Sequence, residues 1–517
     1  MRISNNAADL FAEIWRDLSE NHEATEGAIA EQAAEPRERT LGFSRRLIQS
    51  RLALDDQVKG LDDLQKFIRG DGDPSGIWMR RLLVAQGIDE WYEGVGTLAL
   101  DDQLFSLEHL RAQYLLGSAG RFNLVPALGQ VIPKLPASGR RSDPDFAAGM
   151  PLGTDKTRPL YETFKWLVVI PETVPATDPD DCLNGIDERH VKLTYRIVPT
   201  VPRRARGFPA GNLMVGFAPL ALDADDVDLV VSLDDGRGWY DAFPRDLGAQ
   251  AGEALRSLSE AGAHIVIFPE ATMHPSAHAP LRDAISRHGK ASELELVVAG
   301  TTSREAEGGM PRNEAVIYDA RGVEIGRQSK LHRWNLNSDQ RRQLGVVSHL
   351  SDDELLYERI RPGDEVVVFE LGELGRFCVL ICEDLSRSEP GRFLRANLAL
   401  DWVFTPILDR SIEEHRWMHS FGKAAARDGR CRVAVSNSLA LTHRSNAARL
   451  LPPLSECGAA LCVDWRHDRE AAGERAAGDE SDVRYFLWKV KLADAAPWAA
   501  INWDVEAWAP TSVSTSR

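Results

Sequence analysis

The sequence lacks several features that would place it in a particular class of protein. None of its apolar runs approaches the ~18 residues needed to span a bilayer, and its first residues do not resemble a secretory signal. Its six cysteines, at positions 182, 378, 382, 431, 457 and 462, show no dense spacing typical of a disulfide framework. Acidic residues outnumber basic ones by 78 to 61, which disfavours nucleic acid as a partner. We therefore expect a cytoplasmic protein with reduced thiols and no membrane contact.

Helical spacing of apolar residues marks the first part of the chain. Leu10, Ile14 and Leu18 lie four positions apart while charged residues fill the other face, a pattern that predicts an amphipathic helix. Similar spacing continues to about residue 122, without a catalytic constellation. We expect a mainly α-helical N-terminal region at 1–122, typical of a helical bundle or a docking module. Binding of a protein partner through this region stays an open alternative.

The composition changes twice after this region. Residues 123–209 begin with a stretch rich in Pro, Gly and Ser, and we interpret them as a linker and mixed segment. The strand candidate at 191–198 would be either an edge strand of the next domain or the last piece of the extension. Strand-like and helix-like segments then alternate through 210–505, which predicts an α/β domain, and 506–517 is interpreted as a flexible tail.

Three reactive side chains follow strand-like segments of the α/β domain. Cys382 closes the apolar run FCVLIC, Glu270 follows IVIFP, and Lys330 follows a hairpin-like stretch. The carboxyl ends of buried parallel strands are where open α/β folds place their ligands. Each residue alone is more simply explained as a core thiol, a helix-starting carboxylate or a surface lysine. Together, a thiol, a carboxylate and an amine are the parts of a nucleophilic amide-cleaving site.

Three short motifs carry a family resemblance. FPE at 268–270, SKLH at 329–332 and ICED at 381–384 resemble, in that order, the signatures of the nitrilase superfamily of carbon-nitrogen hydrolases. The Pro-Gly turn at 361–364 (RPGD) also resembles the family's turn ahead of its cysteine strand. The resemblance covers roughly 210–465. It implies an αββα sandwich that forms four layers when two copies pair as a homodimer, preceded here by the helical region.

The resemblance also implies a role for each reactive residue. Cys382 would be the nucleophile that forms a thioester, and Glu270 the general base. Lys330 would stabilise the oxyanion together with the backbone N–H of Glu383. Members of the family carry a second glutamate near the Pro-Gly turn that orients the lysine. We assign this role to Glu358.

Two departures from the family pattern affect these assignments. Arg361 stands directly before the turn, so the second glutamate lies further upstream, with Glu354 as the next candidate after Glu358. The pair after the nucleophile, Glu383-Asp384, resembles the glutamine-hydrolysing branch, notably the amidase domain of glutamine-dependent NAD synthetases. We find no Ser-Gly-Gly-type nucleotide loop to accompany it.

An insertion separates the lysine from the cysteine. The spacing from Lys330 to Cys382 exceeds that of compact members, and the excess lies in 334–360. Asn337 precedes a helical pattern and is a suitable capping residue. The insertion would either reshape substrate access or form a surface helix away from the pocket. Such an insertion also resembles nitrilase-type domains attached to bacterial anti-phage systems.

The sequence therefore predicts a cysteine-dependent hydrolase of a linear amide or a related non-peptide C–N bond, an amidase rather than a nitrilase. One alternative is a nitrilase-like effector or ligand-binding module of a signalling or anti-phage defence system, and another is an N-acyltransferase. His415 and His419 lie four apart on an expected helix but have no third zinc ligand. We expect neither a metal nor a cofactor.

Overall fold

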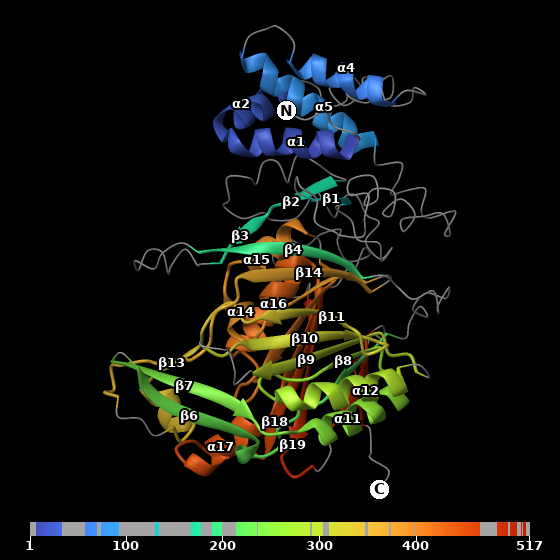
Figure 1. Ribbon diagram of the computed structural model, residues 1–517. Helices are drawn as coiled ribbons and strands as arrows, with labels where there is room; N and C mark the ends of the chain where they lie inside the picture. Colours follow the sequence, from blue (N-terminus) through green and yellow to red (C-terminus); the bar gives the residue numbers. More distant parts are fainter. Residues whose placement is uncertain are drawn as a thin grey trace, which may run out of the picture.

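The fold is mixed α/β with several sheets, as the sequence predicts. The computed structural model describes residues 7–33, 57–69, 74–91, 130–133, 167–176, 189–198 and 213–512, the last range with gaps at 235, 290–291, 303–309, 347–349, 372–373, 399, 466–482, 495–496, 504–507 and 509 (Figure 1). The end of the expected helical region (92–122), most of the Pro-, Gly- and Ser-rich stretch that follows it, and most of the expected tail lie outside the described residues.

Two large sheets form the centre of the molecule. The larger sheet has the strand order β19-β18-β17-β16-β15-β14-β4-β3, and the other has the order β11-β10-β9-β8-β5-β20-β21. The strands of the first sheet are β3 (Thr173–Pro175), β4 (His190–Val198), β14 (Glu365–Leu371), β15 (Gly375–Val379), β16 (Trp402–Ile407), β17 (Arg432–Asn437), β18 (Glu456–Trp465) and β19 (Val483–Lys491). Those of the second are β5 (Met214–Phe217), β8 (Ile265–Ile267), β9 (Leu296–Thr302), β10 (Asn313–Asp319), β11 (Glu324–Ser329), β20 (Ala499–Asn502) and β21 (Pro510–Ser512).

The principal core includes residues from both large sheets. Successive strand residues point to opposite faces, so Ile265 and Ile267 of β8 join this core while Val266 joins the cluster beneath two helices. Aromatic rings of the larger sheet pack together in the core, with 5.1 Å between the ring centroids of Phe369 and Phe377. Because both faces of these strands are covered, their sequences are nearly continuous apolar runs.

Helices cover the outer faces of the two sheets. In the second sheet's outer cluster, α11 (Gly248–Glu260) and α12 (His278–His288) pack side by side through residues such as Leu255 and Leu281 (Figure 1). On the larger sheet, α16 (Trp417–Gly429) packs against β17, β18 and β19, next to α15 (Gly391–Asn397). Of the two histidines expected on one helix, His419 lies on α16 and His415 precedes it.

Four N-terminal helices pack against one another at the top of Figure 1: α1 (Ala7–Glu20), α2 (His22–Ala33), α4 (Gln57–Arg69) and α5 (Pro74–Trp91). The apolar face expected from the spacing of Leu10, Ile14 and Leu18 is buried. Between these helices and the large sheets lies a two-stranded antiparallel pair, β1 (Gln130–Pro133) and β2 (Leu167–Ile170). Among the described residues, no helix is both long and apolar enough to cross a membrane.

Strand β4 decides between two interpretations of the segment before residue 210. It pairs in parallel with β14, from Lys192 opposite Glu365 to Val198 opposite Leu371, and β3 pairs on its other side. The buried Arg376 of β15 strengthens this attachment, since its Nε donates to the hydroxyl of Tyr195 at 2.9 Å. The strand at 190–198 is therefore part of the larger sheet.

A smaller sheet lies at the lower left of Figure 1, with the order β12-β13-β7-β6. Its strands are β6 (Val227–Asp234), β7 (Arg237–Pro244), β12 (Asn335–Leu336) and β13 (Leu356–Glu358). It joins the hairpin after β5 to the insertion at 334–360. Within the insertion, α13 (Ser338–Gln343) begins after Asn337, whose side chain accepts from the Gln340 N–H in a capping box. The predicted cap is thus confirmed.

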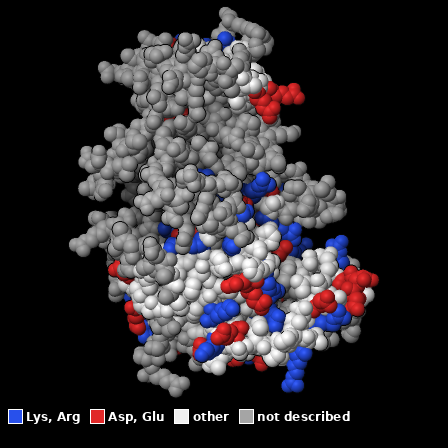
Figure 2. All heavy atoms as spheres, turned by 180° about the vertical axis from the view of Figure 1, so that it is seen from behind, with Lys and Arg blue, Asp and Glu red and all other residues white. Residues whose placement is uncertain are grey.

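The described surface carries charges of both signs. On the face opposite to that of Figure 1, Lys and Arg side chains are interspersed with Asp and Glu (Figure 2). Many of these charges form pairs within one element, as Arg256 does with Glu260 on α11. The five cysteines that the structure describes, Cys378, Cys382, Cys431, Cys457 and Cys462, are all buried.

Candidate active site

Lys330 joins two carboxylates in the interior of the domain. Its Nζ donates to Glu270 Oε1 at 2.9 Å and to Glu358 Oε2 at 2.7 Å, and all three residues are at most 5% exposed. Glu270 lies just past β8, Lys330 directly follows β11, and Glu358 ends β13. The structure thus brings together three of the predicted site residues from three separate elements.

Neighbouring groups fix the orientation of both carboxylates. Asn313 Nδ2 donates to Glu270 Oε1 at 2.7 Å and to Glu358 Oε1 at 3.0 Å. The backbone N–H of Leu408 donates to Glu270 Oε2 at 2.9 Å, and that of Trp334 to Glu358 Oε2 at 3.1 Å. Each carboxylate is therefore satisfied on both oxygens although it is buried.

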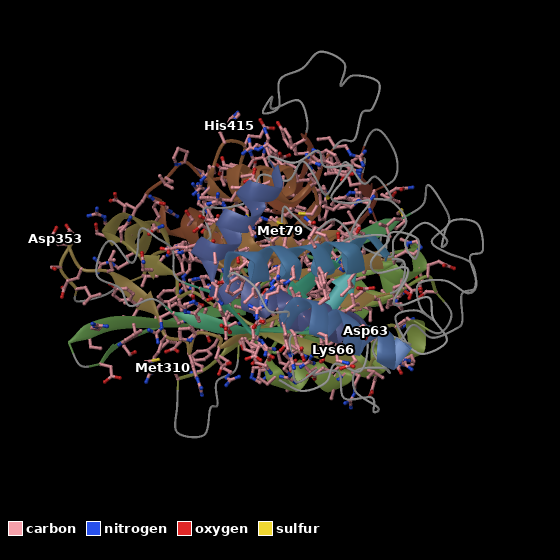
Figure 3. All side chains as sticks on the ribbon, turned by 90° about the horizontal axis from the view of Figure 1, so that it is seen from above. Asp63, Lys66, Met79, Met310, Asp353 and His415 are labelled. Carbon is pink, nitrogen blue, oxygen red and sulfur yellow. The ribbon has the colours of Figure 1, made fainter. Side chains whose placement is uncertain are left out.

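Strand pairing decides which glutamate faces the lysine. Glu358 lies opposite Tyr240 where β13 pairs in parallel with β7, and this pairing directs its side chain to Lys330. The other candidate, Glu354, is exposed, and its carboxylate accepts from the backbone N–H and the hydroxyl of Ser351. Asp353, next to it, lies at the outer edge of the molecule in Figure 3.

Cys382 adopts a backbone conformation that is rare for a residue with a side chain. Strand β15 ends at Val379, and α14 (Glu383–Ser386) begins directly after Cys382, whose φ is 49° and ψ is −106°. The expectation that the strand continues to Cys382 is therefore wrong at its end. A positive φ outside glycine costs about 1–3 kcal/mol and persists only where its surroundings hold it. Here the Cys382 N–H donates to the carbonyl of Pro406 at 3.0 Å.

Only 1% of Cys382 is exposed, and its thiol lies close enough to the Glu270 carboxylate for each group to shift the pKa of the other. Burial raises the pKa of the Cys382 thiol well above its ordinary value, and the negative charge of Glu270 raises it further. Burial also raises the pKa of Glu270, although the Lys330 ammonium opposes this shift. A protonated thiol therefore rests beside a carboxylate of increased basicity.

The charge of Lys330 is held by its two partners. Burial alone would lower the pKa of Lys330, but the carboxylates of Glu270 and Glu358 outweigh this effect and keep it well above its ordinary value. Lys330 therefore stays a cation. The arrangement places a fixed positive charge, a proton acceptor and a thiol within one buried cluster.

Close backbone contact supports the position of Glu270. A Cβ atom on Gly300 of β9 would lie 2.5 Å from the carbonyl oxygen of Pro269 and 2.9 Å from the Cα of Glu270. Glycine is required there because any side chain would push β9 away from the strand end that carries the carboxylate.

Asp384 connects the cysteine segment to the lysine segment. Its fully buried carboxylate accepts from the N–H groups of Leu331 and His332, at 3.0 and 2.9 Å, and contacts His332 Nδ1 at 2.9 Å. The Nε2 of His332 lies 2.7 Å from the carbonyl oxygen of Ala176, just after β3. Segments from three parts of the chain therefore meet at this one carboxylate and the imidazole beside it.

Arg189 forms a second connection between the first 209 residues and the site. Its Nη2 donates to the carbonyl oxygens of Leu331 and Gly363, each at 2.9 Å. Gly363 belongs to the predicted Pro-Gly turn, and its N–H donates to the carbonyl of Lys330 at 2.8 Å. The backbone on both sides of Lys330 is thus tied to neighbouring segments.

A small pocket opens onto the carboxylates and the lysine. Its volume is about 20 Å³, on a measure where one water needs roughly 10–15 Å³. Apart from Glu270, Lys330 and Glu358, its lining residues are Leu229, Tyr240, Ala242, Ala271, Asn313, Trp334, Leu336, Leu344, Leu408 and Leu441. Three of them, Trp334, Leu336 and Leu344, come from the insertion. Of the two interpretations of the insertion, the structure favours the one in which it shapes the pocket.

Two pocket residues, Tyr240 and Asn313, escaped the sequence assignment. Burial raises the pKa of Tyr240 well above its ordinary value, and the nearby Glu358 raises it further. Neither residue carries a local signal, because Tyr240 lies in an ordinary aromatic-rich strand and Asn313 at the start of an apolar one. The SKLH motif could have pointed to Asn313 only indirectly. The strand before Lys330, β11, pairs with β10, and β10 begins at Asn313.

The remaining candidates lie elsewhere. His419 Nδ1 accepts the backbone N–H of His415 at 3.2 Å, and His415 lies at the edge of the molecule in Figure 3. Within the described part of the chain, no group of three or more His, Cys, Asp or Glu side chains is arranged to hold a metal ion. Glu383 begins α14, and its carboxylate pairs with Arg387 at 2.9 Å.

Comparison with known proteins gives partial likenesses only. No family model matches this sequence, and no curated protein matches it. Among solved structures, a mutant amidase from Nesterenkonia sp. AN1 in complex with butyramide is 15% identical, with 45% of this chain and 79% of that chain covered and a TM-score of 0.31. Another mutant of the same amidase, described as belonging to the nitrilase superfamily, is 14% identical over the same shares, with a TM-score of 0.31. The glutamine-dependent NAD+ synthetase from Acinetobacter baumannii is 13% identical, with 59% of this chain and 48% of that chain covered and a TM-score of 0.34.

Proposed function

We propose that this chain is a cysteine-dependent hydrolase of a non-peptide amide, built on a nitrilase-type αββα sandwich that pairs into a homodimer. One observation carries the proposal. A thiol at a strained turn lies beside a buried carboxylate of raised pKa, and that carboxylate contacts a buried lysine cation. These are the nucleophile, the base and the electrostatic stabiliser that acyl transfer to sulfur requires.

The first half of the reaction forms a thioester. Cys382 Sγ attacks the amide carbonyl carbon while Glu270 accepts the thiol proton, so that a carbon–sulfur bond forms and the carbonyl oxygen becomes an oxyanion. Lys330 and the backbone N–H of Glu383 stabilise this oxyanion. Glu270 then gives its proton to the amide nitrogen, the carbon–nitrogen bond breaks, and the amine leaves.

The second half hydrolyses the thioester. Glu270 accepts a proton from water, whose oxygen attacks the thioester carbon to give a second oxyanion at the same position. Collapse of this intermediate breaks the carbon–sulfur bond, releases the carboxylic acid and returns the proton to sulfur. Glu270 thus acts as base and acid in turn, which suits a carboxylate with a raised pKa.

The experiment that tests this proposal combines product release with trapping of the intermediate. The full chain is incubated with glutamine, asparagine, ureido compounds and short acyl amides, and ammonia release is measured. Samples quenched with acid are digested and analysed by mass spectrometry. We expect ammonia from at least one amide and a mass increase, equal to its acyl group, on the peptide that contains Cys382.

Two other results would contradict hydrolysis. Alkylation of Cys382 by iodoacetamide without ammonia release from any amide would favour the ligand-binding alternative. If an added amine is acylated in preference to water, the N-acyltransferase alternative is favoured instead.

Replacement of Glu358 tests how Lys330 is held. In Glu358→Gln the lysine loses one of its two negative partners, so we expect kcat to fall by about 10²–10³-fold, as when one oxyanion-stabilising group is lost. The matched control is Glu354→Gln, four residues away on the surface. Steady-state kinetics should show a large loss for the first variant and wild-type kcat for the second. Equal kcat in both variants would remove Glu358 from the mechanism.

A further inference from the structure

We infer that the pocket accepts uncharged amides with a compact, apolar acyl group rather than amino acid amides such as glutamine. This inference rests on the proposed function, since it concerns the substrate class of the same site. It follows from the lining of the pocket and from the partners of its charged residues.

The walls of the pocket are apolar. Five leucines line it, together with Ala242, Ala271 and Trp334; the leucines are Leu229, Leu336, Leu344, Leu408 and Leu441. Most of these side chains belong to a hydrophobic cluster that joins the smaller sheet to α17 (Ala440–Ala448). An acyl group that enters next to the catalytic carboxylates therefore meets hydrocarbon on most sides.

The charged residues of the pocket are already paired. Glu270, Lys330 and Glu358 are its only charged lining residues within the described structure, and they bind one another. A substrate with an ammonium and a carboxylate would have to bury both without an opposite charge in this lining. Burial of an unpaired charge is strongly unfavourable, so a zwitterionic acyl group is disfavoured.

The other polar groups of the pocket are neutral. Tyr240 contributes a hydroxyl to the lining, and its raised pKa keeps that hydroxyl protonated. Asn313 is fixed by the two carboxylates that accept from its Nδ2, and its Oδ1 is buried without a hydrogen-bond partner within the described structure. A neutral donor and a neutral acceptor suit the carbonyl and N–H groups of an uncharged amide.

The insertion limits the length of the acyl group through Leu344. This residue caps the C-terminal end of α13, is 6% exposed, and its carbonyl oxygen accepts from Arg444 Nε at 3.1 Å. The end of α13 and the hydrogen bond from Arg444 therefore hold the backbone from which the Leu344 side chain reaches the pocket. With a volume of about 20 Å³, room for roughly one or two water molecules, the pocket favours a compact acyl group.

The test compares substrates that differ only in charge or in length. The full chain is assayed for ammonia release from acetamide, propionamide, butyramide and hexanamide, and from succinamate and glutamine. We expect kcat/KM for butyramide to exceed that for succinamate, which has the same carbon chain but a terminal carboxylate, by 10²-fold or more. Glutamine should be at least as poor a substrate as succinamate.

Variants of Leu344 test the limit on length. Leu344→Ala is expected to raise the ratio of kcat/KM for hexanamide to that for propionamide by about tenfold or more, the range of one or two methylene groups in an apolar pocket. Leu450→Ala, at an exposed leucine, is the matched control and should leave the ratio unchanged. Because the ratio compares two substrates on one preparation, partial unfolding of Leu344→Ala would lower both values and leave the ratio unchanged.

Binding to Cys382→Ala, measured by calorimetry, separates failure of the inference from failure of the proposed function. One outcome is that neutral amides bind Cys382→Ala, that this binding changes when Leu344 is also replaced, and that the unmodified chain releases no ammonia. This outcome would refute hydrolysis and retain the inference. Efficient hydrolysis of glutamine or succinamate would overturn the inference and leave hydrolysis standing. Absence of turnover for every amide tested, together with absence of binding for the neutral amides, would overturn both.

Discussion

Replacing Cys382 with alanine is expected to abolish amide turnover, with a loss of about 10⁴-fold or more in kcat. Without sulfur there is no atom to attack the carbonyl carbon, and Glu270 and Lys330 can contribute only binding and electrostatic stabilisation. Binding of a neutral amide should persist because the pocket walls are unchanged. Ammonia release and calorimetry on the same preparation measure both quantities.

Cys378→Ala is the matched control for this variant. Cys378 lies four residues upstream, is fully buried, and burial raises the pKa of its thiol far above the ordinary value. Within the described structure, no hydrogen bond joins Cys378 to the cluster of Lys330 and its two carboxylates. Loss of its thiol should therefore cost about 1 kcal/mol of stability and leave kcat unchanged. The assignment of the nucleophile fails if Cys382→Ala retains activity or if Cys378→Ala loses as much.

The parts of the site that follow strands could be predicted from the sequence. Glu270 follows an apolar segment that is recognisable as a buried strand, Lys330 follows a hairpin-like stretch, and the two strands, β8 and β11, belong to the same sheet. The position of Glu358 could not be predicted from local sequence in this way. It depends on a strand of three residues that pairs with β7, more than a hundred positions earlier. Such a short strand has no periodicity to detect.

Other features depend on contacts between distant segments and had no local signal. The run that ends in Cys382 is apolar throughout, so nothing in it indicates that the strand stops at Val379 and that Cys382 turns to a positive φ. Likewise, strand β4 could be recognised as a strand candidate, but nothing in its sequence shows which sheet it joins. Its membership of the larger sheet depends on its parallel pairing with β14.

The pocket illustrates the same limit. Its walls come from the hairpin of β6 and β7, from the insertion, from the residue after β16 and from α17, and these segments touch only once the chain has folded. In the sequence, Leu229, Leu344 and Leu441 are ordinary core leucines. Their common position around one cavity is a property of tertiary packing, which is why the motifs suggest a chemistry but give no indication of the substrate.

Contacts between the early part of the chain and the site bear on how the domain is divided. Arg189 and Ala176 lie before residue 210, where the sequence predicts the α/β domain to begin, yet both hydrogen-bond the segment that follows Lys330. A fragment that begins at 210 would lose these contacts and one edge of the larger sheet. The full chain is therefore the appropriate material for each of the kinetic measurements above.

Replacing Glu270 with glutamine is expected to lower kcat/KM by about 10⁴-fold, the upper end of the range for a general acid or base, because this carboxylate serves as both in turn. Glutamine preserves the size of the side chain and can accept from Leu408, but it cannot take the thiol proton. Steady-state ammonia release measures the loss, and Glu354→Gln serves again as the control with an exposed carboxylate.

The pH dependence of the unmodified chain gives a second measure of the same group. The pKa of Glu270 is raised above its ordinary value of 4.5, and only the ionised form accepts a proton. As the pH falls through this raised pKa, the carboxylate is protonated and kcat/KM should fall, so the acid limb of the profile lies above pH 4.5. The residual activity of Glu270→Gln should lack that limb, because no titrating group remains at this position. An acid limb that is identical in the variant would mean that a group other than Glu270 is the base.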